Sequence, residues 1–152
     1  MSVWRTNTTS PEATEELAAA VGRRLKGGEV VELISDLGGG KTAFVRGLAR
    51  GMGSHDHVAS PTFTVAREYQ SDKLTLYHFD FYRLHDPGII AAELAEFISD
   101  PKAVVAVEWS DIVRHVLPEK RLTVRLSLTG ESSRKLELTF PGELAYVIPE
   151  EQ

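Results

Sequence analysis

Residues 35–42, Ser-Asp-Leu-Gly-Gly-Gly-Lys-Thr, have the composition of a loop that holds phosphate groups. Its glycines allow the backbone to turn so that several N–H groups point at phosphate oxygens. Lys41 supplies a cation for the β- and γ-phosphates, and the hydroxyl group of Thr42 can ligate Mg²⁺. The sequence therefore predicts that ATP or ADP binds with Mg²⁺ at Asp36, Leu37, Gly38, Gly39, Gly40, Lys41, Thr42 and Ala43.

The flanking residues help to distinguish a phosphate loop from a flexible turn followed by a surface lysine. Residues 29–34 are rich in β-branched and apolar side chains, which indicates a strand, and apolar residues recur at helical spacing after Lys41. The N-terminus of that helix would add a partial positive charge. Ser35 stands where the strict motif has glycine, and the end of a strand permits this because φ stays negative there. The context favours nucleotide binding.

Two acidic residues follow predicted strands and could complete such a site. Glu108 ends an apolar run at 103–107, and Asp80 ends the strand predicted at 74–79. Ligands gather at the carboxyl ends of strands in open α/β sheets, and a phosphate loop needs an acid near Mg²⁺. The alternatives are a surface acid at Glu108 and a local salt bridge at Asp80.

Two further features have both a functional and an ordinary interpretation. Ser60, Pro61 and Thr62 follow the phosphate-loop helix, where a hydroxyl group can sense Mg²⁺ or the γ-phosphate, but the same residues suit a plain turn. Trp109 could belong to the core or cover the edge of the site.

The pattern of elements predicts an α/β fold. A helix begins at Ser10-Pro11 and ends at Gly27-Gly28, and residues 53–61 form a loop. The strands at 64–68 and 74–79 pair antiparallel with one exposed face, whereas the apolar run 103–107 indicates a buried parallel strand. Further elements are predicted at 89–98 and 110–116 (helices) and at 121–128 and 135–140 (a hairpin). The prediction is a P-loop NTPase-like, three-layer fold, with a mixed sheet of parallel centre and antiparallel edge strands, in one domain over 1–152.

Composition limits the other classes of function. The chain has 152 residues, no cysteine and a formal charge of −5, so no thiolate metal site or disulfide framework is expected. The sequence has no apolar run of about 18 residues, so no membrane span is expected. The start of the chain lacks a secretory pattern, which predicts a cytoplasmic protein. The basic residues are scattered, so if RNA is involved, a partner is expected to hold most of it.

Four motifs in order, spanning about Ala13 to Pro118, resemble the TsaE family of small bacterial ATPases. They are SDLGGGKTAFVRGLARGMG, VASPTFTV, YHFDFYRL and VVAVEW. The resemblance implies ATP hydrolysis that supports threonylcarbamoyladenosine modification of tRNA, together with a TsaD-type catalytic subunit and a TsaB-type companion. It also implies that tRNA is engaged only through the complex.

The resemblance also implies roles for individual residues. Lys41 would bind phosphates, Thr42 and Glu108 would hold Mg²⁺, and Asp80 would support the metal and the attacking water, which makes Lys41, Asp80 and Glu108 the catalytic set. The loop of Ser60, Pro61 and Thr62 would be a switch. Trp109 would lie beside the nucleotide, and Pro11 would border the adenine. Ser35 departs from the family's usual glycine.

Other functions share the phosphate loop. A small P-loop kinase would need an acceptor site and usually an arginine-rich lid, and no such segment follows Phe97. A GTPase is disfavoured because the chain's only asparagine is Asn7, which leaves no guanine-reading motif. A nucleotide-gated binding module without useful turnover would have much the same sequence.

Overall fold

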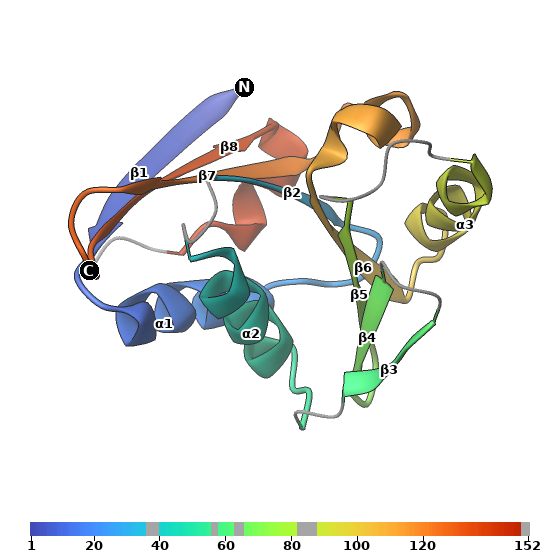
Figure 1. The fold of residues 1–152 in the computed structure, drawn as a ribbon, viewed down its shortest axis with the longest axis horizontal. Helices are drawn as coiled ribbons and strands as arrows, with labels where there is room; N and C mark the ends of the chain where they lie inside the picture. The colour runs from blue at the N-terminus through green and yellow to red at the C-terminus, as the bar shows by residue number, and fades with distance from the viewer. Residues whose placement is uncertain (36–39, 56–57, 63–65, 82–87, 150–152) are drawn as a thin grey trace.

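In a computed structural model of the chain, the described residues are 1–35, 40–55, 58–62, 66–81 and 88–149. Their strands form one mixed sheet of eight strands in the order β1-β8-β7-β2-β6-β5-β4-β3 (Figure 1). The elements are β1 (Ser2–Thr8), α1 (Pro11–Gly22), β2 (Val30–Ser35), α2 (Lys41–Gly51), β3 (Val58–Thr62), β4 (Ala66–Gln70), β5 (Thr75–Asp80), α3 (Gly88–Ile98), β6 (Ala103–Glu108), the 3₁₀ helix η1 (Ser110–Val116), β7 (Leu122–Leu128), β8 (Arg134–Phe140) and the 3₁₀ helix η2 (Gly142–Val147).

The centre of the sheet is parallel and its two sides are antiparallel. Strands β7, β2, β6 and β5 run in the same direction, whereas β8 and β1 on one side and β4 and β3 on the other pair antiparallel. Every residue of β6 is buried, as expected for a central parallel strand. The predicted α/β fold with a parallel centre and antiparallel edges is confirmed.

Helices cover both faces of this sheet and create three layers. Because alternate residues of a strand point to opposite faces, β5 places Leu76 among the residues that pack with α1 and α2, and Phe79 among those that pack with α3 and η1. Both side chains are fully buried. The prediction that this strand pair has one exposed face is therefore wrong for β5, because α3 and η1 cover the second face. No helix in the described ranges is long and apolar enough to cross a bilayer.

Glycines set the close contact between α1 and α2. A Cβ atom at Gly47 would lie 2.3 Å from the carbonyl oxygen of Glu15, and one at Gly22 would lie 2.4 Å from that of Leu48. α1 begins as predicted, since Ser10 caps it by accepting a hydrogen bond from the amide of Ala13. It ends at Gly22 rather than at the predicted glycine pair, because bonds to the third residue back close its last turn.

The predicted loop at 53–61 is also partly wrong, because residues 58–62 form the edge strand β3. β3 pairs antiparallel with β4, and the register shifts between Ala59 and Thr62. Pro61 is compatible with this position, since an edge strand leaves one side without a ladder and tolerates a residue that lacks an N–H group. Local turn signals in the sequence do not reveal such pairing.

Candidate functional site

The turn from β2 to α2 has the backbone that the phosphate-loop prediction requires at both of its described ends. Ser35 is the last residue of β2 and pairs in register with Leu126 of β7, so it has the extended backbone that a serine accepts. Gly40 precedes α2 with φ of 99°, a conformation that favours glycine. Lys41 is the first helical residue. The predicted phosphate contacts of Asp36, Leu37, Gly38 and Gly39 fall outside the described residues.

Lys41 and Glu108 form a buried ion pair at the start of α2. The Nζ atom of Lys41 lies 3.4 Å from Oε1 of Glu108, and the two side chains are only 9% and 8% exposed. The other carboxylate oxygen pairs with Nε2 of His78, which comes from β5. A buried charge is tolerated only when it is paired and hydrogen-bonded. The structure therefore joins α2, β5 and β6 through one carboxylate.

The environment of Glu108 favours its charged form. Burial raises the pKa of this carboxyl group, but the hydrogen bond and charge of His78 and the charge of Lys41 outweigh it, so that the pKa lies below its ordinary value. Glu108 thus stays ionised near neutral pH, as a carboxylate that ligates a metal must be.

Trp109 has a strained backbone beside this ion pair. Its φ and ψ are 54° and 53°, and it is the only non-glycine residue with positive φ among those that the structure describes. Its ring lies 4.7 Å from the Nζ atom of Lys41, within the range of a cation–π contact, and the residue is 36% exposed. Trp109 therefore lies at the edge of the candidate site and not in the core.

The structure places the other predicted site residues on β5, α2, α1 and β3. Asp80 ends β5 beside Glu108 in register and is exposed, and Thr42 is exposed in the first turn of α2. The structure thus brings the carboxyl ends of β5 and β6 to the N-terminus of α2. Pro11 begins α1, and its place beside adenine stays a prediction. The predicted switch residues have their backbone in the edge strand β3, and their role is untested as well; they are Ser60, Pro61 and Thr62.

The donor atoms at this edge of the sheet suit magnesium. Carboxylates at Asp80 and Glu108 and the hydroxyl group of Thr42 are hard oxygen ligands. The described ranges contain no group of three His, Cys, Asp or Glu side chains that could hold a metal ion. Mg²⁺ usually binds proteins through one or two carboxylates and takes its other ligands from phosphates and water. The residues therefore fit an ion that arrives with a nucleotide better than a permanently enclosed one.

A small hollow adjoins the ion pair. It has a volume of about 120 Å³ and opens between the end of β2, the start of α2 and the first turn of η1. Its lining comprises Leu33, Ile34, Ser35, Lys41, Trp109, Ser110, Asp111 and Arg114.

Comparisons with known proteins show the family of this chain. The family model described as threonylcarbamoyl adenosine biosynthesis protein TsaE matches residues 8–136. This chain belongs to the TsaE family. It is 36% identical over 148 residues to the tRNA threonylcarbamoyladenosine biosynthesis protein TsaE of Bacillus subtilis, covering 97% of this chain and 91% of the relative. Its TsaE relative from a Nostoc species is 37% identical over 131 residues, covering 84% of this chain and 80% of the relative. The crystal structure of Bacillus subtilis YdiB superposes with a TM-score of 0.74 at 32% identity, covering 93% of this chain and 88% of the other.

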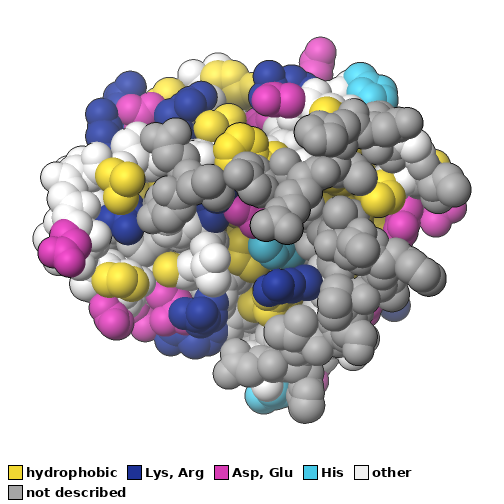
Figure 2. All heavy atoms as spheres, in the orientation of Figure 1, with side chains coloured by type: hydrophobic (Ala, Val, Ile, Leu, Met, Phe, Trp, Pro, Cys, Tyr) yellow, Lys and Arg dark blue, Asp and Glu magenta, His cyan; other side chains and the backbone are white. Residues whose placement is uncertain are grey.

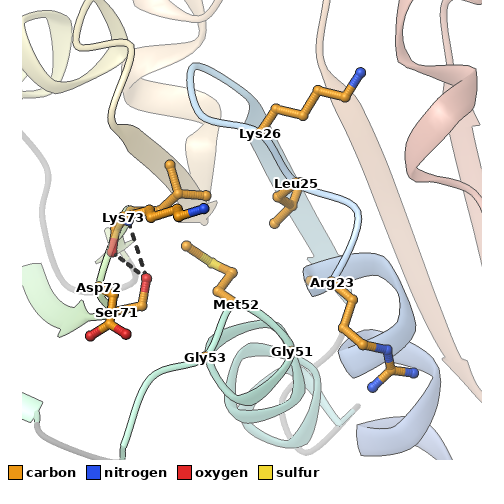
Figure 3. A pocket seen from close by; sticks show the side chains of 11 residues that line it. Arg23, Leu25, Lys26, Gly51, Met52, Gly53, Ser71, Asp72 and Lys73 are labelled. Carbon is orange, nitrogen blue, oxygen red and sulfur yellow. Dashed lines mark hydrogen bonds between the residues drawn. The ribbon is translucent and has the colours of Figure 1, made fainter.

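This TsaE-family chain has a second, wider hollow away from the ion pair. It has a volume of about 480 Å³ and lies between the ends of α1 and α2 and the β4–β5 turn (Figure 3). Met52 and Lys73 extend into it, whereas Arg23 and Lys26 point away. The carboxyl ends of the two helices carry partial negative charge, which disfavours phosphate. This hollow holds none of the residues of the predicted phosphate loop, so its size alone does not make it the candidate nucleotide site.

Two side chains in or beside the candidate site were not predicted from the sequence. The first is His78, although it precedes Asp80 by two residues and strand periodicity therefore places both on one face. The second is Glu32, a carboxylate 2% exposed in the central strand β2. The signal for Glu32 was a single acid inside an apolar strand, which must find partners when it is buried.

The carboxylate of Glu32 is fully engaged on the sheet face opposite α2. Its Oε2 atom accepts a hydrogen bond from Oγ of Ser110, and Oε1 accepts bonds from Nε of Arg121 at 3.1 Å and Oγ1 of Thr123 at 3.2 Å. Arg114 adds a charge at 3.6 Å. These bonds connect β2 with η1 and with the start of β7.

We expect Glu32 to make stability depend on acid pH. Burial raises its pKa, but hydrogen bonds from Ser110 and Arg121 and the charges of Arg121 and Arg114 outweigh burial, so that its pKa lies below the ordinary 4.5. Because the folded pKa is the lower one, the stabilising contribution is complete above about pH 4.5 and is lost as the pH falls through the folded pKa.

Urea unfolding of the wild type and of Glu32→Gln at several pH values tests this expectation. The difference in the free energy of unfolding should be largest at neutral pH and should shrink as the pH falls below 4.5. The exposed Glu119→Gln serves as the matched control, with a difference that stays small throughout. A pH-independent difference for Glu32→Gln would contradict a depressed pKa.

Proposed function

We propose that this chain binds ATP with Mg²⁺ and hydrolyses it, and that this activity supports threonylcarbamoyladenosine modification of tRNA. The observation that carries the proposal is the buried Lys41–Glu108 pair at the N-terminus of α2. An ammonium group and a carboxylate are held there at the carboxyl ends of parallel strands, where ligands of open α/β sheets bind. The start of α2 adds a partial positive charge for phosphate.

Each of the chain's own site residues would have a separate role in binding the nucleotide and in hydrolysis. Lys41 exchanges its contact with Glu108 for the phosphate oxygens, which frees the carboxylate to face the metal. Glu108 and Thr42 would hold Mg²⁺, which would offset negative charge that develops on the phosphates. Asp80 lies beside Glu108 in register and orients the attacking water. Trp109 borders the nucleotide, as its contact with Lys41 supports.

The part played in tRNA modification is supported by the relatives. The TsaE proteins of Bacillus subtilis and Nostoc carry tRNA threonylcarbamoyladenosine biosynthesis in their names. We infer that a TsaD-type subunit and a TsaB-type companion hold the tRNA. The net charge of −5 favours binding of the tRNA by these partners and not by this chain. On the face in Figure 2, the described acidic and basic side chains are interspersed. Strong autonomous RNA binding would call for a basic surplus.

The test is the rate of ATP hydrolysis by the purified chain, alone and with the TsaB-type and TsaD-type partners. Slow turnover that rises when both partners are added supports the proposal. Turnover that the partners leave unchanged would contradict the partner-dependent role and leave a stand-alone ATPase. Transfer of the phosphate to a small acceptor would instead identify a kinase, and nucleotide binding without turnover in the complex would identify a gated binding module.

A further inference from the structure

The junction between β6 and η1 is anchored on both faces of the sheet. Glu108, the last residue of β6, bonds toward α2 through Lys41 and His78. Ser110, the first residue of η1, donates its hydroxyl group to Glu32 on the opposite face. The residue between these two anchors is Trp109, which has the left-handed backbone.

Glu32, to which Ser110 donates, is itself held by further hydrogen bonds. Glu32 lies in β2, between β6 and β7, and is held by Arg121 and Thr123 through its second oxygen. Both Ser110 and Glu32 are almost wholly buried, at 4% and 2% exposure. A buried carboxylate keeps its partners firmly, because an unpaired charge in the interior is costly.

We propose that Glu32, acting through Ser110, is a positioning residue that holds the Trp109 ring over Lys41. The inference rests on the proposed function, because it assigns the Trp109 ring to the wall of the nucleotide site. A non-glycine residue in the left-handed region persists only where its surroundings enforce it. Without the bond to Glu32, Ser110 loses its fixed place, Trp109 relaxes to a negative φ, and its ring leaves the ammonium group.

The experiment begins with Trp4→Phe, which leaves Trp109 as the only tryptophan of the chain. In this background Ser110→Ala removes the hydroxyl group, and Ser110→Cys keeps a side chain of similar size while donating weakly. The matched control is Thr123→Val, which removes a different hydrogen bond to Glu32, while Arg121 still bonds to the same carboxylate oxygen and the Ser110 bond is kept. The readouts are Trp109 emission, its quenching by acrylamide without nucleotide, and the Kd for ADP from calorimetry.

Both Ser110 variants should shift the emission to longer wavelength and increase quenching, because the ring moves into water. They should also raise the Kd for ADP by about fivefold to tenfold, the range expected when a cation–π contact and its geometry are lost. Thr123→Val should change none of these three readouts. Emission and quenching unchanged in both Ser110 variants would overturn the positioning role.

A double-mutant cycle distinguishes an effect of Ser110→Ala that is transmitted by the Trp109 ring from a general loss of structure around position 110. In a Trp109→Ala background, Ser110→Ala should no longer change the Kd for ADP, since its effect is transmitted by the missing ring. Equal effects of Ser110→Ala in both backgrounds would overturn this inference while leaving ADP binding established. Failure of the Trp4→Phe chain and the wild type to bind ADP would instead overturn the proposed function, and with it the assignment of Trp109 to a nucleotide site.

Discussion

Lys41→Ala is expected to abolish the rise in melting temperature that ATP and Mg²⁺ give the wild-type chain. A ligand at about 100 times its Kd stabilises a protein by about 2.7 kcal/mol. For a chain of this size that corresponds to a rise of roughly 5–11 °C. The ammonium group of Lys41 lies at the first position of α2, where it can reach phosphate oxygens, so its loss should remove this stabilisation.

The same change should also lower the melting temperature without ligand. Glu108 would keep His78 but lose its ion-pair partner, and a buried charge with fewer partners costs about 1–3 kcal/mol. The decisive quantity is therefore the ATP-induced shift, measured by scanning calorimetry, and not the melting temperature itself. Lys73→Ala, an exposed lysine in the β4–β5 turn, should keep the full shift. A wild-type shift in Lys41→Ala would refute the phosphate-loop assignment.

The sequence predicts features that depend on neighbouring residues. The continuous apolar run before Glu108 is typical of a strand buried on both faces, and the structure makes it β6, one of the two central strands. Ser10 followed by Pro11 marks the start of α1, because a side-chain cap and a residue without an N–H group both suit that position. The glycine at position 40 likewise fits a local requirement, the positive φ before α2.

Features that depend on distant residues were missed. Glu32 and Ser110 are 78 positions apart, and His78 and Glu108 are 30 apart. The order of the strands brings His78 to Glu108, and η1 places Ser110 against Glu32 of β2; no local pattern encodes either arrangement. The edge strand β3 was missed for the same reason, since its partner β4 and not its own turn-like residues makes it a strand.

Glu108→Gln is expected to keep ADP binding while losing Mg²⁺-dependent hydrolysis. Glutamine preserves the shape of the side chain and can still accept hydrogen bonds, but it no longer offers a charged oxygen to the metal. Lys41 would also be released from its ion pair, so the affinity for ADP should be unchanged or higher. Because a metal contributes several kcal/mol of charge stabilisation, hydrolysis should fall by about 100-fold or more.

Calorimetry with ADP and a phosphate-release assay with the partners present would measure both quantities. Glu16→Gln, a carboxylate on α1 that pairs with Arg50 at the surface, is the matched control and should hydrolyse ATP like the wild type. Asp80→Asn separates the two acids at this edge of the sheet. Full hydrolysis by Glu108→Gln with none by Asp80→Asn would assign the metal to Asp80 alone, and Glu108 would then serve only to neutralise Lys41 before the nucleotide arrives.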